Sequence, residues 1–304
     1  MFARNYRSAL LLIVALISVS SGCEKDQHPE YRTNCSGNSG SKKKVLFIGM
    51  DGCRSDALKA ARTPAIDSLM AQGLYSFHVD RGIYTVSVPG WTTLLHGVFP
   101  EKHGCRNNSF DGCDYAAYPD LFYYIKSARP ELQLFTLTHW EDFLKITTHE
   151  DFAMTYKSDR EVRNAALHVL MNCHPDVLLL HFEAPDSAGH ETAFHPDTSR
   201  YLAAIEMDDR FIGDILHEIE FREEQFGEEW LIIVCTDHGG EGTTHGKQDA
   251  LPQTRFVFLI VSGSFLTRKE VTGSVSNTDV FPTIMQHLNI SVKDEWGIDG
   301  KSWL

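Results

Sequence analysis

The chain has 304 residues, of which 42% are hydrophobic and 23% are charged, and its formal net charge is −13. This composition is typical of a globular protein and excludes a disordered or collagen-like chain. This net negative charge argues against broad nucleic-acid binding, which needs clustered Lys and Arg. It is compatible with a small anionic substrate, because bound metal ions can supply positive charge.

The N-terminal residues have the pattern of an export signal. Arg4 and Arg7 precede a largely apolar run over residues 9–19, and small residues follow it. This order predicts a signal peptide over residues 1–23 and a secreted or cell-envelope protein. The alternative, an uncleaved membrane anchor, is disfavoured because a helix that spans a bilayer needs ~20 apolar residues.

The end of this segment is similar to a bacterial lipoprotein cleavage site. The step from Gly22 to Cys23 fits such a site, whereas Ser20 stands where Leu is usual. A lipid on Cys23 would anchor the mature protein to a membrane without spanning it.

Export also permits disulfide bonds among the seven cysteines. Cys105 and Cys113 flank a short loop, so we expect them to pair, and the pairing of the other cysteines is left open. None of the spacings matches the paired C-x-x-C motifs of a structural zinc site.

Residues 24–43 are polar and predict a flexible linker, followed by a single folded domain over residues 44–304. Short apolar runs predict strands, and apolar residues at helical spacing predict helices. This alternation of strands and helices predicts an α/β fold with a mainly parallel central sheet and helices on both faces. In chain order, the predicted elements are the strand Val45–Met50, the helix Pro64–Gln72 with Thr63 as its cap, the helix Asp159–Cys173, the strand Val177–Phe182, the helix Thr198–Phe221, the strands Trp230–Cys235 and Phe256–Val261, and the helix Asn277–Leu288.

Three of the predicted strands run directly into polar clusters. In sheets of this kind, ligands bind beyond the carboxyl ends of the strands, so we expect the clusters to lie together. Their carboxylates and imidazoles suit zinc or a similar divalent cation. An isolated Asp or His is more often a structural residue. Here, however, all three clusters directly follow predicted strands of one sheet. The candidate metal ligands are Asp51, Asp186, His190, Asp237, His238 and His245.

A further candidate site begins at Ser87, which is followed by Val88 and Pro89. Pro89 fits the first turn of a helix, where main-chain N–H groups and the helix dipole favour an anion. A metal ion would lower the pKa of the Ser87 hydroxyl and make it nucleophilic. The alternative is that Ser87 only caps the helix, and this segment taken alone favours the cap.

Together the motifs resemble the alkaline phosphatase superfamily, and most closely its type I phosphodiesterase/nucleotide pyrophosphatase branch. The resemblance extends from about residue 44 to the C-terminus, and the motifs occur in the family's order, which is more specific than any one of them. The matching motifs are the strand entering Asp51-Gly52, the segment Pro89–Gly97, the segment Phe99–Gly104, the segment Phe182–His190 and the segment Thr236–Gly239.

The resemblance implies a catalytic domain that hydrolyses phosphoesters, with phosphodiesters or nucleotide pyrophosphates as the expected substrates. It implies a covalent intermediate on Ser87 and two divalent metal ions, for which zinc is the expected element. One ion would activate Ser87, and the other would stabilise the leaving oxygen or the attacking water. By motif, Asp186, His190 and His245 would hold one ion, and Asp51, Asp237, His238 and the Ser87 oxygen would hold the other.

Two features depart from the family pattern. The branch usually has Asn three residues after the nucleophile, where it helps to bind a phosphoryl oxygen, and this chain has Gly90. Asn107 or Asn108, shortly after the segment Phe99–Gly104, are candidates for part of that role. The chain is also short for the family. Both departures affect the identity of the substrate more than the type of reaction. We expect the substrate to be a small anionic ester.

Other functions compete with this interpretation. A sulfatase of the same superfamily carries the motif C/S-x-P-x-R, and this chain has Trp91 at the position of the Arg. A phosphate-group mutase is disfavoured because the predicted export argues against a role in central metabolism. A phosphomonoesterase would need an added cation for its extra charge, for which Arg106 is a candidate, while the acidic balance favours the diester. A metal-stabilised binding protein without catalysis is the last alternative.

Overall fold

The computed structural model describes residue 35 and residues 37–304. The predicted signal peptide, the lipid site at Cys23 and most of the predicted linker lie outside these residues, and those interpretations stay predictions. Within the described part, Cys35 forms a disulfide with Cys173, and the Ser39 hydroxyl donates to the Asp176 carboxylate over 2.8 Å. None of the helices in this part is both long enough and apolar enough to cross a bilayer.

A sheet of eight strands lies at the centre of this part, in the order β4-β3-β5-β1-β6-β7-β2-β8. β7 runs antiparallel to its neighbours β6 and β2, and the other neighbouring pairs are parallel. The mainly parallel sheet that the sequence predicts is therefore confirmed. The strands are β1 (Lys43–Met50), β2 (Leu74–Asp80), β3 (Leu134–Thr138), β4 (Phe152–Thr155), β5 (Val177–Phe182), β6 (Glu229–Cys235), β7 (Phe256–Ser262) and β8 (Lys269–Glu270).

The central strands β1, β5 and β6 are almost wholly apolar and buried, as expected for strands covered on both faces. Met50 of β1 lies opposite Phe182 of β5, and Gly49 lies opposite Cys235 of β6. Because these strands are parallel and end in register, the polar residues that follow them start from one edge of the sheet.

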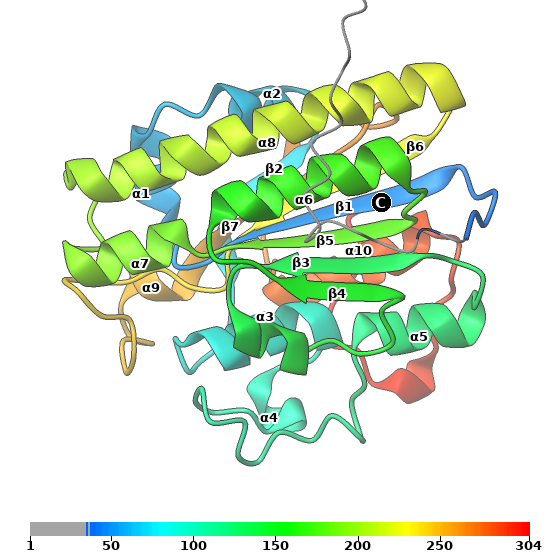
Figure 1. Cartoon of the computed structure of the whole chain (residues 1–304). Helices are drawn as coiled ribbons and strands as arrows, with labels where there is room; N and C mark the ends of the chain where they lie inside the picture. The colour runs from blue at the N-terminus through cyan, green and yellow to red at the C-terminus, as the bar shows by residue number, and fades with distance from the viewer. Residues whose placement is uncertain (1–34, 36) are drawn as a thin grey trace, which may run out of the picture. The chain divides into compact units, whose positions relative to one another are not determined.

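Helices cover both faces of the sheet, as predicted (Figure 1). On one face α8 packs against α2 and α6, and on the other lie α3, α5 and α10. The main hydrophobic core lies between the sheet and this second set of helices, with Trp91, Phe122 and Phe281 among its buried side chains. The helices are α1 (Ser55–Ala60), α2 (Pro64–Gln72), α3 (Ser87–His96), α4 (Pro100–His103), α5 (Leu121–Ala128), α6 (Asp159–Asn172), α7 (Ala184–Glu191), α8 (Ser199–Phe226), α9 (Pro252–Arg255) and α10 (Val280–His287), with the 3-10 turns η2 (Glu141–Lys145), η3 (Asn277–Asp279) and η4 (Asp294–Trp296).

The N-cap position predicted for α2 is confirmed. Thr63 occupies the N-cap position, but its side chain makes no capping hydrogen bond. Instead the Asp209 carboxylate of α8 accepts from the main-chain N–H groups of Ala65 and Ile66. A carboxylate from a distant helix thus replaces the Thr63 side chain as the hydrogen-bond acceptor, and the sequence around Thr63 contains no sign of this replacement.

Candidate metal centre

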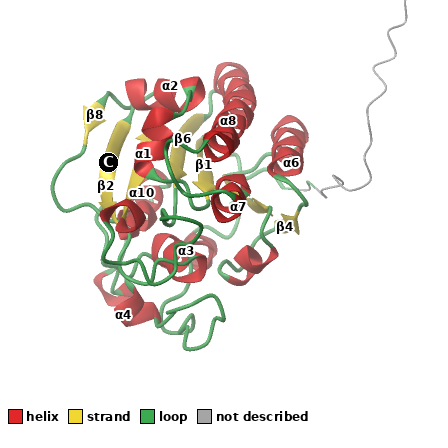
Figure 2. Cartoon of the chain, turned by 90° about the vertical axis from the view of Figure 1, so that its left-hand side faces the viewer, coloured by secondary structure: helices red, strands yellow, loops and turns green. Residues whose placement is uncertain are grey.

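The predicted ligands follow three adjacent strands. Asp51 comes directly after β1, α7 follows β5, and the loop from Thr236 leads out of β6. Since β1 lies between β5 and β6, these three segments meet at one edge of the sheet. Figure 2 views the sheet from this end, with α7 turned towards the viewer. The residues brought together there are Asp51, Asp186, His190, Asp237, His238 and His245.

Asp51, Asp237 and His238 form one group of candidate ligands, termed here the Asp51 group. The Nε2 atom of His238 lies 3.5 Å from Asp51 Oδ1 and 3.2 Å from Asp237 Oδ2. All three side chains are buried. Ser87 Oγ lies 3.3 Å from the same nitrogen, so the predicted nucleophile adjoins this group.

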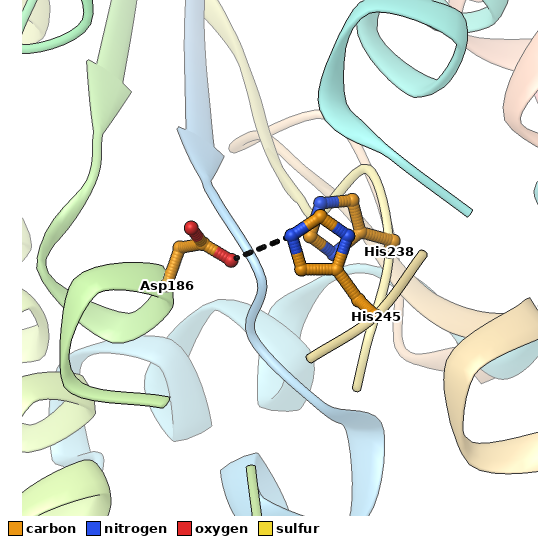
Figure 3. Close-up of side chains that lie close together, drawn as sticks. All are labelled: Asp186, His238 and His245. Carbon is orange, nitrogen blue, oxygen red and sulfur yellow. Dashed lines mark ion pairs between the residues drawn. The ribbon is translucent and has the colours of Figure 1, made fainter. Parts of the chain in front are cut away.

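Asp186, His190 and His245 form a second group, termed the Asp186 group. His190 Nε2 lies 3.3 Å from Asp186 Oδ2 and 3.1 Å from His245 Nε2. Asp186 Oδ1 lies 3.6 Å from His245 Nε2 (Figure 3). The rings of His238 and His245 stack with their centroids 3.8 Å apart, so the two groups are adjacent. His190 is the most open member, with 44% of its side chain exposed.

Both groups contain buried carboxylate oxygens that have no hydrogen-bond partner among the described residues. These atoms are Asp51 Oδ1, Asp186 Oδ1 and Asp237 Oδ2. A buried and unpaired carboxylate oxygen is costly, and one divalent cation can compensate several of them at once. Carboxylates mixed with imidazoles are also a donor set that zinc accepts. The residues present therefore fit the metal ions that the family resemblance implies.

The crowding of acidic groups also shifts their pKa values. Burial, with the nearby charge of Asp51, holds the pKa of Asp237 well above its usual range, and burial likewise raises the pKa of Asp186. Burial alone would raise the pKa of Asp51 too, but the hydrogen bond from His181 and the charge of His238 lower it to about 2. Ionisation of Asp186 and Asp237 beside the charged Asp51 thus needs additional positive charge close by, which bound cations would supply.

Two side chains that the sequence analysis did not assign to the site hold Asp51 in place. The Trp91 indole donates to Asp51 Oδ2 over 2.9 Å, and His181 Nε2 lies 3.1 Å from the same oxygen. The unpartnered Oδ1 is left to face the rest of the Asp51 group. A polar His181 inside the apolar strand β5 is a signal that the sequence contains, whereas the contact of Trp91 depends on how α3 packs.

We expect His181→Phe to weaken zinc binding by about 10- to 100-fold, as loss of a group that orients a metal ligand usually does. The new ring keeps its packing beside Trp91 but no longer donates to Asp51. Competition for zinc against a chelating dye measures the effect. His287→Phe is the matched control, because His287 is equally buried at the amino-terminal end of β1. Equal zinc affinities in the two variants would contradict a supporting role for His181.

Ser87 is the first residue of α3 and does not cap it. Val86 occupies the N-cap position, and its side chain makes no capping bond. Asn108 Oδ1 accepts from the Val88 N–H over 3.0 Å and so serves this end of the helix. The Ser87 hydroxyl instead lies beside His238, near the positive end of the helix dipole. The structure therefore disagrees with the alternative in which Ser87 is only a cap.

The loop after α4 distinguishes the two candidate asparagines. The expected disulfide between Cys105 and Cys113 is present and closes this loop. Asn107 Oδ1 accepts from the Ser109 N–H over 2.8 Å and so stays within the loop. Asn108 instead reaches α3, and because its Oδ1 atom is occupied there, its NH2 group remains as a donor close to the nucleophile segment.

Comparison with known proteins places these features in context. The sequence model described as "Type I phosphodiesterase / nucleotide pyrophosphatase" matches residues 45–123 and 112–257. Bis(5'-adenosyl)-triphosphatase ENPP4 of Homo sapiens is 24% identical over 230 residues, which cover 68% of this chain and 49% of that protein. The same enzyme of Pongo abelii is 21% identical over 283 residues, 83% of this chain and 60% of that protein. The chain thus spans about half the length of the curated relatives that it matches.

Solved structures share the fold. An inactive variant of murine ectonucleotide pyrophosphatase/phosphodiesterase 5, in complex with AMP, superposes with a TM-score of 0.66 at 16% identity and covers 83% of this chain and 96% of that one. A 2-O GAG sulfatase gives a TM-score of 0.65 at 15% identity, with 86% of this chain and 73% of that chain covered. At such identities the likeness concerns the fold, and it confirms the alkaline-phosphatase-like architecture expected from the sequence.

Proposed function

The chain belongs to the type I phosphodiesterase/nucleotide pyrophosphatase family, and from this premise we propose that it is a metal-dependent phosphoester hydrolase with Ser87 as its nucleophile. The observation that carries the proposal is the 3.3 Å contact between Ser87 Oγ and His238 Nε2. This contact places a hydroxyl at the start of a helix beside a group of buried carboxylates and imidazoles that can bind a metal ion. A serine in such a setting can become a nucleophile.

The two groups of donors would each hold one divalent cation, and zinc is the element that their chemistry suits best. When bound, such ions lower the pKa of a hydroxyl and stabilise negative charge on a phosphoryl group. Trp91 and His181 keep Asp51 oriented towards its group. The proposed ligand sets are Asp51, Asp237, His238 and the Ser87 oxygen for one ion, and Asp186, His190 and His245 for the other.

The protein's own residues then perform the displacement. Ser87 Oγ gives up its proton and forms a bond to phosphorus while the bond from phosphorus to the departing oxygen breaks. The departing group leaves with the electrons of that bond and takes up a proton from solvent. The Asn108 NH2 group donates to a non-bridging phosphoryl oxygen, and the positive end of the α3 helix dipole adds favourable potential at the same place. Water afterwards breaks the phosphoserine bond, which releases the phosphoryl product and restores the Ser87 hydroxyl.

The buried arginines beside the site favour a diester or a nucleotide pyrophosphate over a monoester. Arg54 donates to the Asp56 carboxylate and to the Gly240 carbonyl, and Arg81 donates to main-chain carbonyls. Neither guanidinium is available for the second negative charge of a monoester. Arg106 is exposed on the loop after α4. The names of the relatives, and AMP in one solved neighbour, further support a nucleotide-containing ester.

We expect the purified protein to contain about two zinc ions per chain and to lose all hydrolysis when they are chelated. With zinc present, bis(p-nitrophenyl) phosphate should be hydrolysed faster than p-nitrophenyl phosphate or p-nitrophenyl sulfate. Elemental analysis and a side-by-side assay test both points. Undiminished hydrolysis without metal would refute the proposal. The sulfate ester is a necessary control because sulfatases share the fold, although Trp91 stands where their motif has Arg and is bound to Asp51.

The two neighbouring asparagines offer a matched pair of variants. We expect Asn108→Ala to lower kcat by about 100-fold, in the range typical of losing one donor to a developing oxyanion. Asn107→Ala, on the same loop, removes only contacts with Ser109 and should leave kcat unchanged. Steady-state kinetics on the aryl phosphodiester measure both. Equal effects would mean that Asn108 acts through the loop and not on the substrate.

A further inference from the structure

The segment that leads into Ser87 has a strained turn held by one buried side chain. Tyr84 has a φ of 63°, a conformation that non-glycine residues rarely adopt, and the Val86 N–H donates to the Tyr84 carbonyl over 2.7 Å. The Arg81 guanidinium donates to the carbonyls of Ile83 and Val86, at 3.2 and 3.4 Å, on the two sides of this turn. One side chain thus fixes both ends of the strained segment.

The same guanidinium also reaches the Asp51 group. Arg81 Nε donates to the main-chain carbonyl of Asp237 over 2.7 Å, and Asp237 immediately precedes His238. The Ser87 hydroxyl lies 3.3 Å from His238 Nε2. Arg81 therefore links the turn that leads into Ser87 to the loop that carries Asp237 and His238.

This placement of Arg81 carries an energetic cost. Its side chain is fully buried, and its hydrogen-bond partners in the described part of the chain are three main-chain carbonyls. A buried cation is strongly disfavoured unless it is paired and hydrogen-bonded, and an apolar side chain of similar size often serves stability equally well. Stability alone therefore accounts poorly for an arginine at this position.

Gly90 provides the room that Arg81 occupies. A Cβ atom at position 90 would lie 2.9 Å from Arg81 Nη2 and 2.8 Å from Asp237 Cβ. Both distances are shorter than a side chain tolerates, so the asparagine that the family usually has at this point cannot be accommodated beside Arg81. The departure at Gly90 and the buried Arg81 are thus two parts of one arrangement.

We propose that Arg81, in the space left by Gly90, is a positioning residue that aligns Ser87 with Asp237 and His238. The proposal rests on the proposed function of Ser87. It places Arg81 behind the reacting atoms, where it sets their relative position without contact with the substrate. Misplacement of a nucleophile by about 1 Å can cost about 100-fold in rate, so the loss of this link should appear in kcat.

Arg81→Lys tests the proposal, because lysine keeps the charge but cannot bond three carbonyls in the planar fork of a guanidinium. We expect kcat on the aryl phosphodiester to fall about 100-fold, with KM and zinc content unchanged. Arg222→Lys is the matched control. Arg222 is also buried and donates to the Cys173 carbonyl and the Glu228 carboxylate, far from the site in the fold, so it should lower the melting temperature without lowering kcat.

Gly90→Ala gives an independent test if Arg81→Lys does not fold. Alanine is favoured over glycine within a helix, so helix propensity alone predicts a more stable protein with full activity. The proposal predicts the reverse, a lower kcat at unchanged zinc content, because the new Cβ displaces the Arg81 guanidinium. A normal kcat in either variant, if it folds, would overturn the proposal. A lower kcat that is fully explained by a lower zinc content would overturn it as well. An inactive wild-type protein would instead refute the proposed function itself.

Discussion

Replacement of Ser87 by alanine is expected to reduce phosphodiester hydrolysis by at least about 1,000-fold while zinc binding persists. The variant loses the attacking oxygen but keeps every Asp and His of the two ligand groups. It should also keep the helix, because the N-terminal end of α3 is served by Asn108 and not by the Ser87 side chain. Activity assays, elemental analysis and a melting curve on the same preparation separate these effects.

Ser87→Thr is the companion variant for this experiment. Threonine keeps a hydroxyl at the position where the family has Thr or Ser, so turnover should be retained in part. Turnover of Ser87→Ala close to that of the wild type would show that the serine is not the nucleophile, and the mechanism would then have to be abandoned.

Asp51→Asn is expected to remove both activity and one of the two metal ions, lowering the zinc content from about two per chain to about one. The amide has nearly the shape of the carboxylate and still accepts a hydrogen bond from Trp91, so packing is preserved. It lacks the negative charge that a ligand of the Asp51 group needs. Ser87→Ala and Asp51→Asn should therefore be equally inactive but differ in metal content.

Asp208→Asn is a suitable control for this loss. Asp208 lies fully buried on α8 and belongs to neither ligand group. Burial, with the charge of Asp159, holds its pKa well above the usual range, so asparagine resembles the protonated form that is already favoured. Zinc content should stay at about two per chain in this variant. Retention of both ions by Asp51→Asn would refute the proposed role of Asp51.

Features that depend on short, local patterns could be predicted from the sequence. The strand Val177–Phe182 was predicted with the bounds that the structure has, and the polar residues after β1, β5 and β6 meet at one edge because parallel strands end together. β2 escaped prediction because the polar residues Ser76 and His78 interrupt it, and β4 is a strand of four residues with two of them exposed. The metal-binding role of the clustered residues stays a prediction.

Features that depend on the approach of distant segments could not be predicted. The choice between Asn107 and Asn108 depends on which of them reaches Val88, and adjacent residues in one loop give no local signal for that. The link from Arg81 to Asp237 joins positions 156 residues apart in the sequence, and the reason for glycine at position 90 appears only once both are in place. These contacts are properties of the packed structure, not of any one motif.

The strand order has a consequence for how the protein becomes active. β1 is the first strand of the sheet to be synthesised, yet it lies between β5 and β6, so Asp51 leaves the ribosome well before the residues that complete its group. Chain segments fold as they emerge, but this site cannot form until the loop that carries His245 has also been made. If the predicted signal peptide directs export, the chain crosses its membrane before the site exists. Metal loading and hydrolysis would then begin only at the destination, and the metal supply of that compartment would decide whether a newly made molecule ever works.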